Sequence, residues 1–244
     1  MPETLVLLHG FGGTHRAWDP VLSELDHERY NPLVPDLRGH GTKAGVRPIS
    51  FDGCVGDVLA AAPDRFVLCG YSMGGRVAQH VALAAPERVT RLILVSSGAG
   101  IADPVVRERR IAEDLAFAED LDHMTIEQYA DRWMANPLFD GTDAEAARWW
   151  REDLLRNDPA ALADVLRGIG GGAMEPFWDR LGALTMPVTV IAGSRDEKFV
   201  RWATEDYPAR LPRAEVHVVD GAGHGLPREA PVELAALIQG TAAG

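Results

Sequence analysis

The sequence predicts a doubly wound α/β fold, in which helices cover both faces of a mostly parallel sheet. Three observations predict it: short apolar runs recur along the chain, turn residues bound them, and segments of helical length separate them. Apolar runs of four or five residues without alternation are typical of strands that are buried on both faces, as in parallel sheets. Strands that alternate with helices indicate a doubly wound sheet.

The apolar runs predict six strands, and the segments between them predict three helices. The expected strands are Leu5–Leu8, a weaker one near Leu33-Val34, Phe66–Cys69, Leu92–Val95, Val188–Ala192 and Val216–Val219. The expected helices are Trp18–Leu25, Cys54–Ala62 and Met73–Ala85. Between residues 101 and 178 no strand pattern occurs, and Ala, Leu, Glu and Arg recur at helical spacing. We therefore expect residues 1–100 and 179–244 to form one core, and residues 101–178 to form a helical cap inserted in it.

The charge of the chain limits its expected partners. The 244 residues carry a formal net charge of −12, which argues against binding to nucleic acid or to an anionic membrane surface. All but two of the 24 basic residues are Arg, whose fork of donors suits bidentate binding of carboxylates. No apolar stretch approaches the ~20 residues of a spanning helix, and the first residues do not resemble a signal peptide. We expect no membrane insertion and a cytoplasmic location.

The strongest local signal is Gly70-Tyr71-Ser72-Met73-Gly74-Gly75, a G-x-S-x-G match followed by a further Gly. It follows an expected strand and opens an expected helix, which is the context of a nucleophile elbow. Its glycines allow the sharp turn that lifts the Ser72 hydroxyl clear of the sheet. Ser72 is therefore the candidate reactive side chain.

A reactive serine needs a base, and the base needs an acid to orient it. Asp196 follows the expected strand that ends at Ala192, and His224 follows the one that ends at Val219. The chain order Ser, Asp, His matches a known triad order, and all three follow strand ends. We also expect an oxyanion site, in which the backbone N–H groups of Phe11 and Met73 converge on one oxygen.

Almost the whole chain resembles the α/β-hydrolase superfamily. The segments that carry the resemblance are Leu8-His9-Gly10-Phe11, Pro35-Asp36-Leu37-Arg38-Gly39-His40-Gly41, the serine elbow, and the Asp196 and His224 loops. Within the superfamily, the chain most resembles the 2-succinyl-6-hydroxy-2,4-cyclohexadiene-1-carboxylate synthase family of menaquinone biosynthesis. That narrower resemblance rests on Gly70–Arg76, Gly193–Phe199, Pro137-Leu138-Phe139, and Ala222-Gly223-His224 with Arg228-Glu229.

Arg76 lies in the first turn of the helix that is expected after Ser72, where the helix dipole disfavours a cation by about 0.3–1 kcal/mol. A carboxylated substrate gives a reason for this placement, because Arg and a helix N-terminus attract the same anion. An Arg that reaches outward to a surface acid is the alternative. The resemblance implies that Arg76 holds a substrate carboxylate. It also implies that Tyr71 and Trp133 line the pocket and that Arg110 and Arg156 bind substrate.

The resemblance further implies a lyase that eliminates pyruvate from 2-succinyl-5-enolpyruvyl-6-hydroxy-3-cyclohexene-1-carboxylate. In such an enzyme His224, oriented by Asp196, would deprotonate Ser72, whose oxygen would remove a substrate proton without an acyl-enzyme. A serine carboxylesterase or carbon–carbon bond hydrolase that forms an acyl-enzyme on Ser72 stays open, because the triad serves both. A non-catalytic binding protein is disfavoured because no triad residue is missing. We expect no metal or cofactor, and a small polycarboxylate as the partner.

Overall fold

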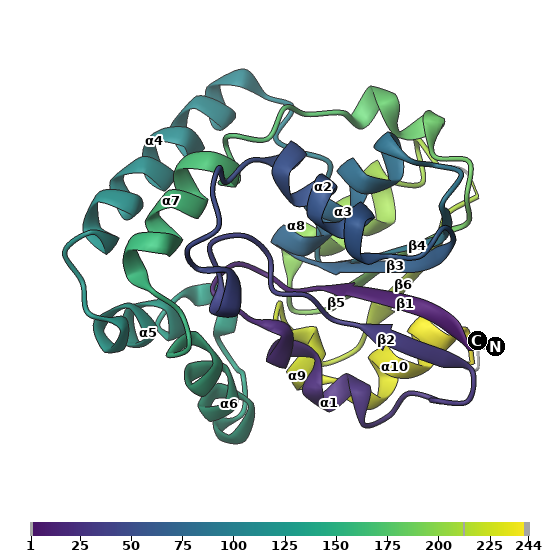
Figure 1. Ribbon diagram of the computed structural model, residues 1–244, viewed down its shortest axis with the longest axis horizontal. Coiled ribbons are helices and arrows are strands. Elements are labelled where there is room, and N and C mark those ends of the chain that lie inside the picture. Colours follow the sequence, from purple (N-terminus) through teal and green to yellow (C-terminus); the bar gives the residue numbers. More distant parts are fainter. Residues whose placement is uncertain (1, 212, 242–244) are drawn as a thin grey trace.

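Six parallel strands form one sheet in the computed structural model, which describes residues 2–211 and 213–241 (Figure 1). The strands are β1 (Glu3–Leu8), β2 (Tyr30–Leu33), β3 (Phe66–Tyr71), β4 (Val89–Val95), β5 (Val188–Gly193) and β6 (Glu215–Val219). Their order is β2-β1-β3-β4-β5-β6, and every neighbouring pair is parallel. The doubly wound class is confirmed, and each expected strand has a counterpart in the sheet.

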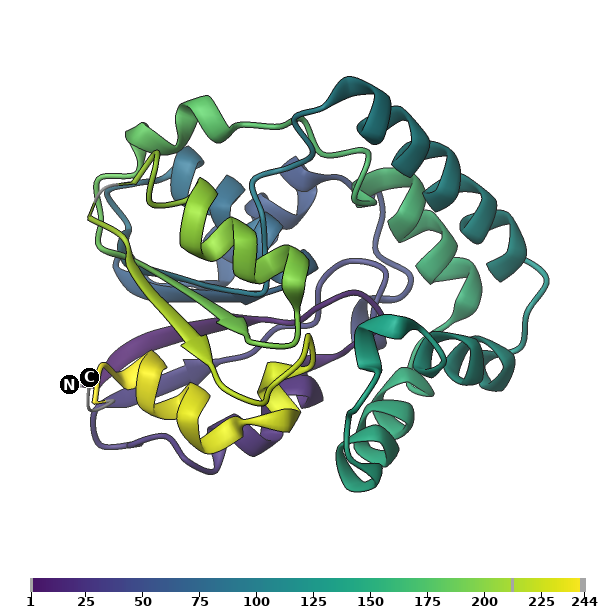
Figure 2. The same cartoon turned by 180° about the vertical axis from the view of Figure 1, so that it is seen from behind.

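Helices cover both faces of the sheet (Figures 1 and 2). One face carries α2 (Phe51–Ala61), α3 (Met73–Ala84) and α8 (Glu197–Arg201), and the other carries α1 (Asp19–Leu22), α9 (Leu226–Glu229) and α10 (Pro231–Gln239). Successive side chains of a strand point to opposite faces, so Leu68 and Cys69 of β3 enter two different apolar layers. Both side chains are fully buried.

Two of the expected helices differ from the observed ones at their first turns. The α2 helix begins three residues early, because the hydroxyl of Ser50 accepts the backbone N–H of Gly53 at 3.0 Å and so caps the first turn. The segment expected as one helix over Trp18–Leu25 is instead a 3₁₀ turn, His15–Trp18, followed by the short α1. Pro20 in the first turn of α1 fits there because it lacks only an N–H that the helix would leave unpaired.

Between β4 and β5 the chain forms four α-helices at the carboxyl ends of the strands, which are called the helical insertion below (Figures 1 and 2). Its helices are α4 (Pro104–Leu121), α5 (Ile126–Met134), α6 (Ala144–Leu154) and α7 (Pro159–Ile169), with a short 3₁₀ turn at Pro137–Phe139. Each of the four α-helices begins after a side chain that accepts backbone N–H groups of the first turn; these caps are Asp103, Thr125, Asp143 and Asp158.

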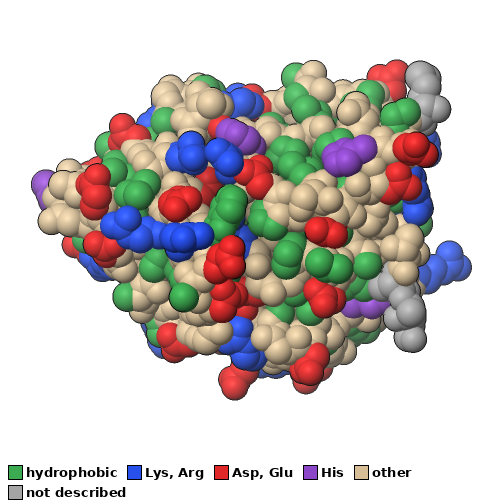
Figure 3. All heavy atoms as spheres, turned by 90° about the horizontal axis from the view of Figure 1, so that it is seen from below, with side chains coloured by type: hydrophobic (Ala, Val, Ile, Leu, Met, Phe, Trp, Pro, Cys, Tyr) green, Lys and Arg blue, Asp and Glu red, His purple; other side chains and the backbone are tan. Residues whose placement is uncertain are grey.

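Acidic and basic side chains are interspersed on the face seen in Figure 3. Within residues 2–211 and 213–241, no helix combines the length and the apolar character that a bilayer crossing needs.

Candidate active site

Ser72 lies in a strained turn between β3 and α3. Its φ of 52° is in the left-handed region, which is unusual for a residue with a side chain. The turn is possible because its neighbours lack side chains: a Cβ at Gly74 would collide with the carbonyl oxygens of Leu8 and His9. A Cβ at Gly70 would collide with the backbone of Gly74. The G-x-S-x-G pattern therefore reflects close backbone packing that holds Ser72 at the carboxyl edge of the sheet.

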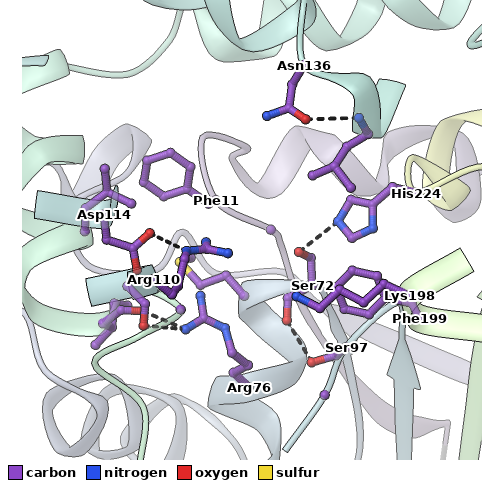
Figure 4. A pocket seen from close by; sticks show the side chains of 18 of the residues that line it. Phe11, Ser72, Arg76, Ser97, Arg110, Asp114, Asn136, Lys198, Phe199 and His224 are labelled. Atoms are coloured by element: carbon purple, nitrogen blue, oxygen red, sulfur yellow. Dashed lines mark hydrogen bonds and ion pairs between the residues drawn. The ribbon is translucent and has the colours of Figure 1, made fainter. Parts of the chain in front are cut away.

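The structure brings Ser72, His224 and Asp196 into one hydrogen-bonded chain. The Oγ of Ser72 lies 3.0 Å from Nε2 of His224, and Nδ1 of His224 lies 2.6 Å from Oδ2 of Asp196 (Figure 4). His224 and Asp196 are buried, at 5% and 6% exposure. With Nδ1–H donated to Asp196, Nε2 is free to accept the Ser72 proton, so the arrangement can generate a basic or nucleophilic serine oxygen.

Aromatic rings and a second serine surround these three hydrogen-bonded residues. The ring centroids of Tyr71 and Phe199 lie 5.4 and 4.8 Å from that of His224. The Ser97 hydroxyl donates to the Ser72 carbonyl at 2.9 Å. These contacts restrict the orientations of the imidazole and of the turn that carries Ser72.

Two residues with free backbone N–H groups among the described residues line the same cavity as Ser72. Phe11 and Met73 both line it, and among the described residues neither N–H donates a hydrogen bond. The loop of Phe11 is held by His9, whose Nδ1–H donates to the carbonyl of Gly10 at 2.8 Å, and whose Nε2 accepts the N–H of Leu37 at 2.9 Å. Burial lowers the pKa of His9, which keeps the ring neutral and able to accept. Unpaired donors in such a position can stabilise an oxyanion.

The cavity has a volume of about 430 Å³ and lies between the core and the helical insertion. One part of its wall is aromatic, with Phe117, Trp133, Phe139 and Trp150. Another part is cationic, with Arg76, Arg110 and Lys198. In Figure 4, Arg76 and Arg110 lie to one side of Ser72 and His224. The site can therefore hold a molecule that is apolar at one end and anionic at the other.

Arg76 points inward and has no acidic partner. Its Nη1 donates to the carbonyl oxygens of Ile169 and Gly170, at 2.9 and 2.8 Å, at the carboxyl end of α7. Among the described residues no carboxylate lies within 4.0 Å of its guanidinium nitrogens. Burial, together with the nearby Arg110, lowers the pKa of Arg76 to about 10. The contacts of the Arg76 guanidinium exclude the alternative in which Arg76 reaches out to a surface acid.

Arg110 and Lys198 complete the cationic wall, and only Arg110 is paired. Its Nε donates to Asp114 at 2.7 Å, while the other oxygen of this buried carboxylate accepts the N–H of Gly172 at 3.0 Å. The Nζ of Lys198 lies 4.6 Å from the centroid of a Trp202 ring, and within the described residues no carboxylate lies within 4.0 Å of it. Desolvation and the positive charge of Arg110 lower the pKa of Lys198. An exposed acid of α4, Glu113, also lines the cavity.

Most of the expected site residues line this cavity, one lies directly behind it, and one does neither. The residues at the cavity wall are Phe11, Tyr71, Ser72, Met73, Arg76, Arg110, Trp133 and His224, with Asp196 directly behind His224. Arg156 is a correction: it is exposed beyond α6 and does not line the cavity. Asp153 in the last turn of α6 and Asn157 just beyond the helix point inward, to Thr14 and to the carbonyl of Gly12. Arg156 lies between these two and points outward.

Sequence reasoning missed Lys198 as a site residue. A signal was present, because Lys198 is one of two lysines in the chain and follows Asp196 by two positions. A residue just past Asp196, at the end of a strand, belongs to the same sheet edge. Within residues 2–211 and 213–241, no cluster of three or more His, Cys, Asp or Glu side chains could hold a metal ion.

Comparison with known proteins gives one consistent result. Residues 5–237 match the family described as "Alpha/beta hydrolase family". A 2-succinyl-6-hydroxy-2,4-cyclohexadiene-1-carboxylate synthase of Enterobacter sp. is 32% identical, with 96% of this chain and 89% of the relative covered. The synthase of Serratia proteamaculans is 31% identical, with 90% and 85% covered. The structure of MenH from S. aureus has a TM-score of 0.91 and 30% identity, over 98% of this chain and 92% of that one. The resemblance expected from the sequence is confirmed.

Proposed function

The chain belongs to the alpha/beta hydrolase family, and from that premise we propose that it is a lyase of menaquinone biosynthesis. Its substrate would be 2-succinyl-5-enolpyruvyl-6-hydroxy-3-cyclohexene-1-carboxylate, from which it eliminates pyruvate. The observation that carries the proposal is the pair of cations, Arg76 and Lys198, that line the cavity of Ser72 and have no carboxylate partner within residues 2–211 and 213–241. The names of the 31–32% identical relatives support the same reaction.

The charge of the cavity wall suits this substrate. The substrate carries three carboxylates: one on the ring, one on the succinyl group and one on the enolpyruvyl group. Arg76, Arg110 and Lys198 supply three cations, of which Asp114 neutralises one. Arg76 is half-buried and Lys198 is exposed, and among the described residues neither has a carboxylate counterion, so this wall favours a ligand that brings negative charge. A neutral ester would leave them uncompensated, which favours the lyase over a general esterase.

The proposed chemistry is a proton abstraction followed by loss of an enolate. Ser72 gives its proton to Nε2 of His224 as its oxygen removes the proton from ring carbon 2, beside the succinyl ketone. The electron pair moves through the ring: double bonds form between carbons 2 and 3 and between carbons 4 and 5, and the bond from carbon 5 to the enolpyruvyl oxygen breaks. The leaving enolate takes the proton from His224 and becomes pyruvate. No bond forms between Ser72 and the substrate.

The oxyanion donors and the helical insertion have separate roles in this proposal. Negative charge that develops on the succinyl ketone oxygen is received by the N–H groups of Phe11 and Met73. Residues 101–178 act as a cap: they supply Arg110 and Trp133 to the wall and limit water around the reacting carbon. Asp196 keeps the Nδ1–H of His224 in place, so that Nε2 remains the accepting nitrogen.

A direct comparison of substrates tests the proposal. Purified protein is given the enolpyruvyl substrate, generated in place because it is unstable, and pyruvate is measured by a coupled assay. A panel of neutral short-chain esters is measured beside it. We expect kcat/KM for pyruvate release to exceed that for every ester by orders of magnitude. Rapid ester turnover without pyruvate release would instead establish the hydrolase alternative.

A further inference from the structure

The loop that carries His224 is held by a single carboxylate, that of Glu229 at the end of α9. The backbone N–H of Gly223 donates to Oε2 of Glu229 at 2.7 Å, and that of Gly225 donates to Oε1 at 3.2 Å. Thus the two amides that flank the histidine are fixed by one charged acceptor, whose side chain is 5% exposed. Hydrogen bonds to an ionised acceptor are shorter and stronger than neutral ones.

Arg195 connects this carboxylate to the loop of the acid. It directly precedes Asp196, and its Nη2 donates to Oε2 of Glu229 at 2.6 Å. Its Nε donates to the carbonyl of Gly221 at 2.9 Å, and its backbone N–H donates to the carbonyl of Ala222 at 2.9 Å. One side chain therefore spans the loops that supply Asp196 and His224.

The same pair of residues also contacts the helical insertion. Nη1 of Arg195 donates to the carbonyl of Asp140 at 2.7 Å, and the hydroxyl of Thr142 donates to Oε1 of Glu229 at 3.1 Å. Between them Gly141 has a φ of 78°, and a Cβ there would collide with the Arg195 guanidinium. The turn over residues 140–142 is thus fitted onto the ion pair.

We infer that Arg195 and Glu229 are positioning residues that hold the His224 loop against Ser72, and that the 140–142 turn ties the insertion to that loop. The inference rests on the proposed function only in that Ser72 must act with His224. Neither residue lines the cavity, so each acts through His224 rather than on substrate. Without the Glu229 carboxylate, two flanking amides lose their acceptor and the imidazole loses its fixed distance to Ser72. A misplacement of about 1 Å can slow a reaction by about 100-fold.

Ser72 labelling by a fluorophosphonate tests the inference, because its rate reports the Ser72–His224 pair without any substrate. The variants are Glu229→Ala, Glu229→Gln, Arg195→Ala and Thr142→Val, and the control is Glu233→Gln, a change of an exposed acid in α10. We expect Glu229→Ala and Arg195→Ala to slow labelling at least about tenfold while labelling still reaches one per chain. Glu229→Gln should recover much of the rate, since its amide oxygen still accepts. Thr142→Val should show a smaller loss, and the control none.

Labelling at the wild-type rate in Glu229→Ala and Arg195→Ala would overturn the inference. A lower final number of labels per chain with an unchanged labelling rate would also overturn it, because that result reports unfolded protein rather than a displaced histidine. If Glu229→Ala does not fold, Arg195→Ala and Thr142→Val decide by the same measure.

A reagent-free measurement separates this inference from the proposed function. The Nδ1 proton of His224, shared with Asp196 at 2.6 Å, should give a low-field NMR resonance that His224→Ala removes. We expect this resonance to broaden or shift in Glu229→Ala, and an unchanged resonance contradicts the inference. If wild-type protein releases no pyruvate but Glu229→Ala still slows labelling, the proposed function fails and the positioning role stands.

Discussion

Ser72 and His224 are 152 positions apart in the chain, and the Oγ of one lies 3.0 Å from the Nε2 of the other. The sheet explains this proximity, since β3 and β6 end at the same carboxyl edge. The imidazole of His224 connects Ser72 to Asp196 through hydrogen bonds at its two ring nitrogens. A change at Asp196, which does not line the cavity, therefore tests the proposed chemistry without altering the cavity wall.

Replacement of Asp196 by Asn should preserve the fold and abolish most of the activity. The amide has nearly the same shape, but it no longer holds the Nδ1–H of His224, so the imidazole can turn its protonated nitrogen toward Ser72. We expect kcat for pyruvate release to fall by about 10³–10⁴, with little change in the thermal unfolding midpoint. Asp220→Asn is the matched control, because Asp220 is an exposed acid in the same region. Equal activity in both variants would remove Asp196 from the mechanism.

Replacement of Arg76 by Gln should weaken substrate binding selectively. A hydrogen bond to a charged group contributes about 1.5–3 kcal/mol, so KM for the carboxylated substrate should rise by about 10- to 150-fold. Turnover of a neutral ester, which leaves the guanidinium unused, should change little. Arg109→Gln is the control, since Arg109 is exposed on α4 and does not line the cavity. An unchanged KM in Arg76→Gln would show that Arg76 does not meet the substrate.

The pH dependence of KM should reveal Lys198. Burial and the nearby Arg110 lower the pKa of its ammonium group, so the cation is lost at a lower pH than for an ordinary lysine. As the pH rises through that lowered pKa, the site loses positive charge and KM for an anionic substrate should rise. Lys198→Arg keeps its charge, so below about pH 10, where Arg76 is still charged, its KM should rise less than that of the wild type. A wild-type KM that does not change with alkaline pH contradicts a role for Lys198 in binding.

The packing of the serine turn predicts a large difference between two glycine substitutions. Gly74→Ala would force a Cβ into the carbonyls of Leu8 and His9, so we expect a marked fall in the unfolding midpoint and slower labelling of Ser72. Gly56→Ala in α2 meets nothing within 4 Å and should stabilise the protein by about 0.5–1 kcal/mol. Chemical denaturation of both variants measures the difference, and equal midpoints would contradict the packing described.

Much of the sheet and the triad could be predicted because their signals are local. An apolar run followed by Gly-x-Ser-x-Gly, or by Asp or His on a loop, places a side chain at the edge of the sheet without any knowledge of the rest of the fold. Arg156 shows where this fails. Its direction depends on which residues at the end of α6 and just beyond it find partners on the core, and those partners, Thr14 and Gly12, are more than 130 positions away.

The contacts of Glu229 show the same limit. Its partners come from two separate loops and from the insertion. Only the fold brings Thr142, Arg195 and Gly223 together, and no spacing in the sequence indicates this. Lys198 is an intermediate case. Its position two residues after Asp196 can be seen in the sequence, but its lack of an acidic partner among the described residues depends on the fold.

A single-turnover experiment with enzyme in excess tests the central claim most directly, that Ser72 acts as a base on a polycarboxylate and not as a nucleophile. Pyruvate release is followed in time, and the mass of the intact chain is measured in samples quenched along the course. We predict one pyruvate per substrate, no mass added to Ser72 at any time, and a rate at least ~10³ lower in Ser72→Ala. A covalent adduct on Ser72 that forms and decays with turnover, or full pyruvate release by Ser72→Ala, would contradict the account.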